Sequence, residues 1–164
     1  MPALEERADG SALLRLDETE SDMLRRLVEE MKALLEVGMS GDPVLERLFP
    51  DAYEDPTEAQ SYRDLTGDDL MSAKVEALEA VRATLGERGG AVLALDAANV
   101  DAWLPILTDL RLAIGTRLDV DDQGMQRAPA PGDPSAAALS VLHWLGRVQQ
   151  TIVEVRLTRA LDEA

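Results

Sequence analysis

The sequence predicts a mostly α-helical protein (all-α class), a compact bundle of about five helices with a small two-stranded β element. Composition is the first reason: 46% of the 164 residues are apolar but only 3% are aromatic, which favours a core of helix-forming aliphatic side chains. The second is a series of long segments in which apolar residues recur every three or four positions. The third is that residues 13–17 and 92–96 are alike: each is an alternating apolar run that ends in Asp and precedes such a segment.

The chain begins with a polar stretch, residues 1–11, that we expect to be disordered. Residues 12–16 are then expected to form the first strand, which places Leu14 and Leu16 on one face. Asp17 is expected to cap the first helix, with Glu20 three residues later as in a capping box. The apolar spacing carries this helix to about Val37.

A short second helix follows, with Asp42 as its cap and Pro43 at its first position. Residues 51–65 are acidic, and we expect them to be irregular apart from one helical turn after Pro56. The apolar periodicity resumes in a third helix over about 67–87.

The second half of the chain repeats the order of strand, cap and helix. The two similar strands are expected to pair with each other, with Leu93 and Leu95 on the buried face. Asp96 then caps a fourth helix that runs to about Leu118. Pro105 falls late for a first-turn proline, which predicts either a kink or a shifted start.

Residues 119–133 are predicted to form a flexible loop, since they are rich in Pro, Ala and Gly. Asp133 and Pro134 repeat the pattern of a capping Asp followed by a first-turn proline, and so predict the start of the last helix. This helix is expected to run to near Leu161. The broad apolar face of this last helix predicts that it is the central helix. We expect residues 12–162 to form a single domain. The apolar face consists of Val141, Leu142, Trp144, Leu145, Val148, Ile152 and Val155.

Several segments resemble a known family. They are residues 45–53 (LERLFPDAY), 101–103 (DAW), 107–118 (LTDLRLAIGTRL) and 144–145 (WL). Over about residues 12–158 the chain resembles "domain of unknown function 2017", a family of high-GC Gram-positive bacteria without an established activity. The resemblance implies a gene neighbourhood that often includes a small adaptor of the Clp protease, and some members have been labelled transcriptional regulators.

The charge of the chain narrows the classes of partner. The net charge is -16, and such a field repels nucleic-acid phosphates and anionic lipid surfaces. We therefore expect no nucleic-acid partner and no membrane association, and we interpret the acidic excess as a solvated surface, the alternative being attraction to a basic partner. The chain has no Cys, which excludes disulfides and thiolate metal sites and is compatible with the cytoplasmic location that we predict.

No catalytic residue, metal site or cofactor is predicted. Glu76 and Glu79 lie one helical turn apart, as in helical nucleotide pyrophosphohydrolases that hold Mg²⁺, but no second carboxylate pair is evident and a solvated face is favoured. Residues 119–124 resemble the first half of a calcium loop, yet its twelfth position is Ala130 instead of a glutamate. His143 is the single histidine and lacks ligand partners at helical spacing.

Five residues are candidates for an interaction site. The two tryptophans lie in the family-like segments, and the two arginines of the fourth helix can anchor a partner or ligand carboxylate. The favoured interpretation for an arginine is structural, in which its stem covers apolar surface while its head reaches water. The candidates are Trp103, Asp109, Arg111, Arg117 and Trp144.

These observations favour a non-enzymatic protein-interaction or regulatory module with an unknown protein partner. The broad apolar face of the last helix makes a homodimer a further expectation. The family's gene context adds a link to Clp-type proteolysis. Two alternatives stay open: a transcriptional regulator, and a metal-dependent nucleotide hydrolase.

Overall fold

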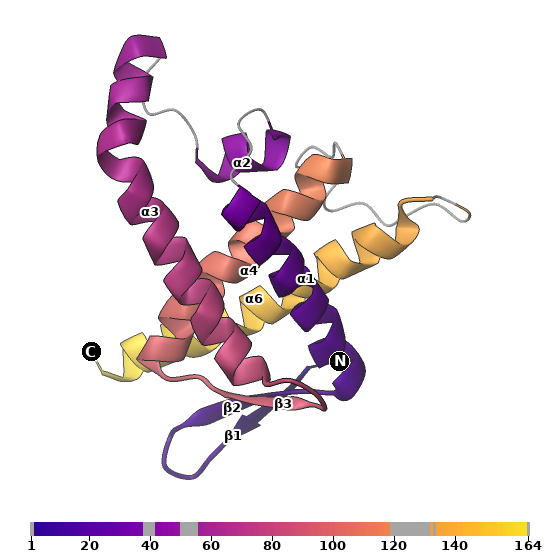
Figure 1. Cartoon of the computed structure of the whole chain (residues 1–164). Helices are drawn as coiled ribbons and strands as arrows, with labels where there is room; N and C mark the ends of the chain where they lie inside the picture. The colour runs from indigo at the N-terminus through magenta and orange to yellow at the C-terminus, as the bar shows by residue number, and fades with distance from the viewer. Residues whose placement is uncertain (1, 38–41, 50–55, 119–131, 133, 164) are drawn as a thin grey trace.

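The computed structural model describes residues 2–37, 42–49, 56–118, 132 and 134–163. Within these residues the predicted fold class is confirmed: five helices gather around one core, and a small antiparallel sheet lies across one end of them (Figure 1). In chain order the elements are β1 (Ala3–Glu6), β2 (Ala12–Leu16), α1 (Glu18–Val37), α2 (Pro43–Leu48), α3 (Pro56–Leu85), β3 (Ala91–Ala94), α4 (Ala97–Leu118) and α6 (Ala136–Asp162).

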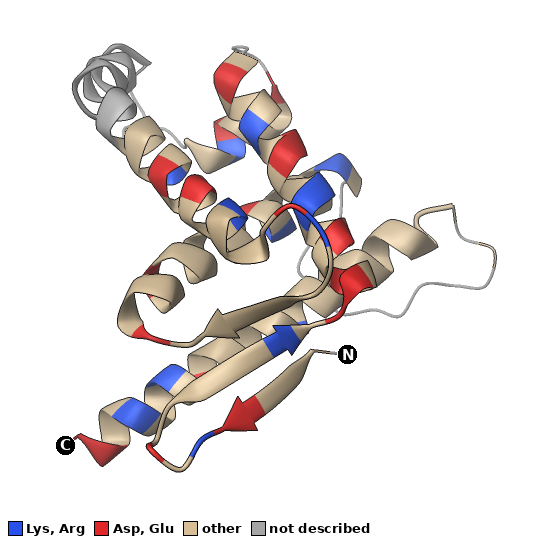
Figure 2. Ribbon diagram, turned by 60° about the horizontal axis from the view of Figure 1, so that its bottom comes forward, with Lys and Arg blue, Asp and Glu red and all other residues tan. Residues whose placement is uncertain are grey.

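The two similar strands pair as predicted. β2 and β3 are antiparallel, with Leu14 opposite Leu93, and β2 is the middle strand of the sheet. Leu14, Leu16, Leu93 and Leu95 are all buried, because alternate residues of each strand face the helices. Figure 2 shows α6 passing behind the sheet, where Arg159 donates to the carbonyl oxygen of Leu95.

The prediction of a disordered N-terminus over 1–11 was wrong, and the sheet has three strands instead of two. β1 pairs with β2 along its whole length, and the guanidinium of Arg15 contacts the carboxylate of Glu5 at 2.8 Å. All four β1 residues are exposed, so no apolar alternation marks this strand in the sequence. The available signal was the turn: Asp9 is followed by Gly10, whose positive φ of 84° suits a hairpin loop.

The predicted caps of α1, α2 and α4 are confirmed. The backbone N–H of Asp17 donates to Glu20 Oε2 at 2.9 Å, and the N–H of Glu20 donates to Asp17 Oδ1 at 2.8 Å, which is a reciprocal capping box. Asp96 accepts from the N–H of Asn99 at the start of α4. Asp42 caps α2 in the same manner.

Helix α3 is longer than predicted. It begins at Pro56 and continues through Gly67, where the sequence predicted an irregular segment and a new start. A glycine inside a helix costs about 1 kcal/mol relative to alanine, which is less than the cost of ending one helix and nucleating another. The helix ends at Leu85, because Gly86 adopts a φ of 67° and its N–H bonds to the carbonyl of Arg82.

Helix α4, and not α6, occupies the centre. It packs against α1, α2, α3 and α6, and its Trp103, Ile106 and Leu107 are buried. Pro105 is exposed and lies inside α4, which starts at Ala97 where Asp96 predicted, so the start is not shifted.

Helix α6 begins at Ala136, two residues later than Pro134 predicted, with Ser135 as its cap. The flexible loop predicted for 119–133, and the calcium-loop comparison with it, lie outside the described residues apart from Gly132. Among the described helices, none has an apolar stretch long enough to cross a membrane.

Candidate functional site

The two candidate tryptophans belong to the core. Trp103 is fully buried in α4. Trp144 of α6 is 7% exposed, and its Nε1 donates to Glu20 Oε1 at 3.3 Å. Glu20 thereby connects the start of α1 to α6, and neither indole is presented to a partner.

Asp109 forms an interior ion pair. Its Oδ2 lies 2.8 Å from Lys74 Nζ, which connects α4 to α3, and both side chains are largely buried. Burial raises the pKa of Asp109, and the hydrogen bond from Lys74 opposes that rise. The Lys74 ammonium also lies 5.8 Å from the ring centroid of Phe49, which follows α2. The geometry gives Asp109 a structural role, in holding three helices together.

Arg117 forms an ion pair within the chain. Its Nη2 lies 3.0 Å from Asp42 Oδ2, so the pair joins α4 to the cap of α2. The backbone N–H of Val44, and next the guanidinium of Arg117, lower the pKa of the Asp42 carboxyl. The guanidinium is therefore committed to the fold, although half of it remains exposed.

Arg111 is held differently. Its Nη1 donates to Gln149 Oε1 at 2.9 Å, and Gln149 in turn donates to the hydroxyl of Thr108. A Cβ at Gly146 would lie 3.5 Å from the guanidinium, so the guanidinium lies directly against α6 at this glycine. Its Nε is buried and has no hydrogen-bond partner within the described part of the chain. No described carboxylate pairs with Arg111.

A shallow groove of about 540 Å³ runs between α4 and α6 beside Arg111. It brings Arg111 together with the exposed Arg147, and neither makes an ion pair with a described residue. No Asp or Glu of the described residues lines this groove, although the chain carries a net charge of -16. The lining residues are Arg111, His143, Gly146, Arg147, Gln149, Gln150 and Val153. We call this the α4–α6 groove.

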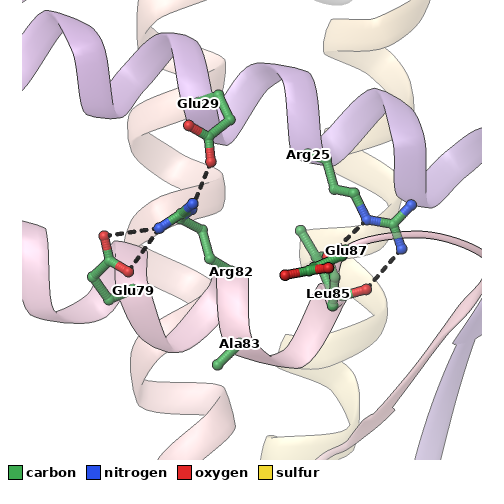
Figure 3. Close-up of a pocket in the computed structure, with 8 residues that line it drawn as sticks. Arg25, Glu29, Glu79, Arg82, Ala83, Leu85 and Glu87 are labelled. Atoms are coloured by element: carbon green, nitrogen blue, oxygen red, sulfur yellow. Dashed lines mark hydrogen bonds and ion pairs between the residues drawn. The ribbon is translucent and has the colours of Figure 1, made fainter.

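A second cleft, of about 530 Å³, lies between α1 and the end of α3 (Figure 3). Arg25 donates to the carbonyl oxygens of Leu85, Gly86 and Gly89, at distances between 2.6 and 3.0 Å, and so caps the end of α3. Its side chain also contacts Asp22 at 2.6 Å. We call this the α1–α3 cleft.

The other arginine of this cleft is paired on both sides. Arg82 lies between two carboxylates, 2.6 Å from Glu29 and 2.9 Å from Glu79 (Figure 3). Its hydrogen bond lowers the pKa of Glu79. Both arginines that line the cleft therefore have partners within the chain, and the cleft is a junction between helices.

The metal-dependent hydrolase gains no support from this arrangement. Glu76 and Glu79 are both exposed, and Glu79 is engaged with Arg82 and Lys32. In the part of the chain that the structure describes, no group of three or more His, Asp or Glu side chains is placed to hold a metal ion.

A row of large apolar side chains continues from the α4–α6 groove. Val153, Leu157 and Leu161 are 37%, 59% and 77% exposed, and their spacing of four places them on one face of α6. We call this the α6 row. The face that was predicted to mediate a homodimer is a different one: Leu142, Leu145, Val148 and Ile152 are buried in the core. That face is therefore already covered within the chain.

Basic and acidic residues alternate along two of the helices. Figure 2 shows Lys and Arg alternating with Asp and Glu along α1 and the visible part of α3. An extended positive surface is what a protein needs to follow a nucleic-acid backbone.

The structure describes a small, mostly helical protein with a three-stranded sheet. The chain is a member of the family "Domain of unknown function (DUF2017)", whose model matches residues 1–156. Two curated relatives carry the name oxidative stress regulator AosR, one from Mycobacterium bovis and one from Mycobacterium tuberculosis. Each is 30% identical over 169 residues, which cover 93% of this chain and 77% of the relative.

A relative from Mycobacterium leprae is 32% identical over 126 residues, covering 68% of this chain and 57% of the relative. No solved structure matches the chain significantly.

Proposed function

We propose that this chain is a non-enzymatic regulatory protein that acts by binding another protein. The observation that carries the proposal is the α6 row: Val153, Leu157 and Leu161 expose apolar surface at helical spacing beside the α4–α6 groove. Contiguous apolar surface with a polar border is typical of protein-binding sites. The names of the mycobacterial relatives support a regulatory role.

An oxidative signal, if this chain responds to one, does not pass through a cysteine. The chain has no Cys, so neither disulfide formation nor sulfenic acid chemistry is available to it. A response to oxidation would therefore reach this chain through its partner, or through a residue type other than cysteine.

A capture experiment in the native host tests the proposal. The tagged chain is compared with Leu157→Ser, and with Leu70→Ser as a matched control, because Leu70 is a comparably exposed leucine on α3. We expect one protein to be enriched by the wild type and the control, and lost with Leu157→Ser. Failure to enrich any protein would contradict the proposal, as would equal recovery by all three.

The same experiment tests the predicted link to Clp-type proteolysis, which would place a protease adaptor or its unfoldase among the enriched proteins. The predicted homodimer is checked by the mass of the purified chain in solution.

Direct binding to DNA is the second candidate function, favoured by the regulator names of the relatives. The net charge of -16 and the alternation of charges oppose it. Retention on random duplex DNA that falls steeply with salt would favour this candidate over the first.

A further inference from the structure

We propose that the α4–α6 groove binds a carboxylate of the partner, and that the occupant is an acidic, amphipathic segment of that protein. Its Asp or Glu side chain would meet Arg111 and Arg147, and its apolar side chains would cover Val153 and Leu157. This inference rests on the proposed function and specifies the chemistry of the partner.

The groove holds Arg111 ready for such a ligand. Gln149 fixes one terminal nitrogen at 2.9 Å, Thr108 fixes Gln149, and the guanidinium lies against α6 beside Gly146. An arginine whose rotamer is already set loses less entropy on binding, and its planar group matches a carboxylate in a bidentate manner. No described carboxylate pairs with Arg111, and the proposal assigns this position to a carboxylate of the ligand.

Charge complementarity identifies the sign of the ligand. Among the described residues, two guanidinium groups and no carboxylate line this groove, whereas the α1–α3 cleft includes three glutamates beside its two arginines. Glu154 lies one turn beyond Gln150, which donates to it at 3.0 Å, and it is not among the residues that line the groove. Beyond this point the exposed side chains of α6 are mixed: Leu157 and Leu161 are apolar, and Arg156 contacts Asp101 at 3.4 Å.

The dimensions suit a peptide segment. Residues 143, 147, 150, 153, 157 and 161 are spaced by three or four and therefore lie on one face of α6. From 143 to 161 this face is about 27 Å long at about 1.5 Å per residue. An amphipathic helix of about five turns, acidic near one end and apolar along one side, would cover it.

A nucleic acid fits this surface poorly. Its phosphates would meet two arginines but would also meet the negative field of the rest of the chain. The apolar α6 row has nothing to contact on a phosphate backbone. A protein segment can pair with the two arginines through a carboxylate and cover the α6 row with apolar side chains.

Selection from a phage library of random peptides, displayed against the whole chain, tests the inference directly. We expect enrichment of peptides with Asp or Glu followed by apolar residues at spacings of three or four. Enrichment of an unrelated pattern, or of none, would overturn the inference.

The selected peptide is then measured by fluorescence anisotropy against matched variants. Arg147→Gln is expected to weaken binding by about tenfold, and Arg111→Gln by at least as much, because each removes one charged contact worth about 1.4 kcal/mol or more. Arg26→Gln is the control, since Arg26 is exposed on α1 and the change in charge is the same. The side-chain Nε–H resonance of Arg111 should shift on binding. Equal affinity for all variants, or competition by random duplex DNA, would contradict the proposal.

The outcomes separate this inference from the proposed function. If Arg147→Glu still captures the host partner, the groove is not the site, although the chain remains a protein-binding regulator. If neither wild type nor variant captures a protein, the proposed function itself fails.

Discussion

The α1–α3 cleft and the α4–α6 groove have similar volumes, about 530 and 540 Å³, and each contains two arginines. In the cleft, Arg25 and Arg82 are saturated by carbonyl oxygens and carboxylates of the same chain. In the groove, Arg111 has one amide contact and Arg147 has no side-chain partner in the described part of the chain. The difference separates two arginines that hold the fold together from two that, among the described residues, have no carboxylate partner and that we propose bind a ligand. Substitutions in the cleft should therefore change stability, and those in the groove should change binding.

The largest loss of stability should come from breaking the most buried ion pair, at Asp109. Asp109→Ala leaves the Lys74 ammonium without its partner, and we expect the free energy of unfolding to fall by about 3 kcal/mol. Urea denaturation measures this change. The double variant Lys74→Met with Asp109→Leu should regain most of the loss, because it buries no unpaired charge. A double variant that is no more stable than Asp109→Ala would show that packing, and not charge, dominates here.

Arg25 provides the next largest effect and the sharpest control. Arg25→Ala removes the donors to three carbonyl oxygens at the end of α3, which should cost about 2 kcal/mol. The adjacent Arg26 is exposed, and Arg26→Ala should change stability by less than about 0.5 kcal/mol. Both values come from the same urea titration. Similar values for the two variants would refute the capping role assigned to Arg25.

The Arg82 pairs should contribute in a manner that depends on pH and salt. Arg82 lowers the pKa of Glu79 from its ordinary value of 4.5 in the folded chain. A carboxylate with a lowered pKa stabilises the fold fully above its ordinary pKa and loses this contribution as the pH falls through the folded pKa. The stability difference between wild type and Arg82→Gln should therefore be largest near neutral pH and at low salt, and should shrink in acid. A difference independent of both conditions would contradict the electrostatic role.

Arg147 should have the smallest effect on folding. It is exposed and has no ion-pair partner among the described residues, so Arg147→Gln should alter the free energy of unfolding by less than about 0.5 kcal/mol. A thermal melt measures this directly. A large loss of stability would show that Arg147 stabilises the fold, as the arginines of the α1–α3 cleft do. The distinction between the two regions would then be wrong.

The local structure of this chain was largely determined by its sequence. The capping aspartates at 17, 42 and 96 act within a few residues of the helices that they start, so their effect needs no tertiary contact. The alternating leucines of β2 and β3 likewise indicated both the strands and their buried face. Strand β1 was not predicted, because its exposed residues carry no apolar alternation. It pairs with β2 at the edge of the sheet.

Only the tertiary structure decided which charged and aromatic residues remain available to a partner. The sequence did not distinguish among the five candidates, which were Trp103, Asp109, Arg111, Arg117 and Trp144. In the structure, Trp103 and Asp109 of α4 are buried. Arg117 is paired with Asp42, and Trp144 donates to Glu20. Arg111 joins Arg147 across two helices that are distant in the sequence. Helical periodicity acts over one or two turns, whereas the neutralisation of a charge depends on which distant carboxylate the fold brings within about 4 Å of it.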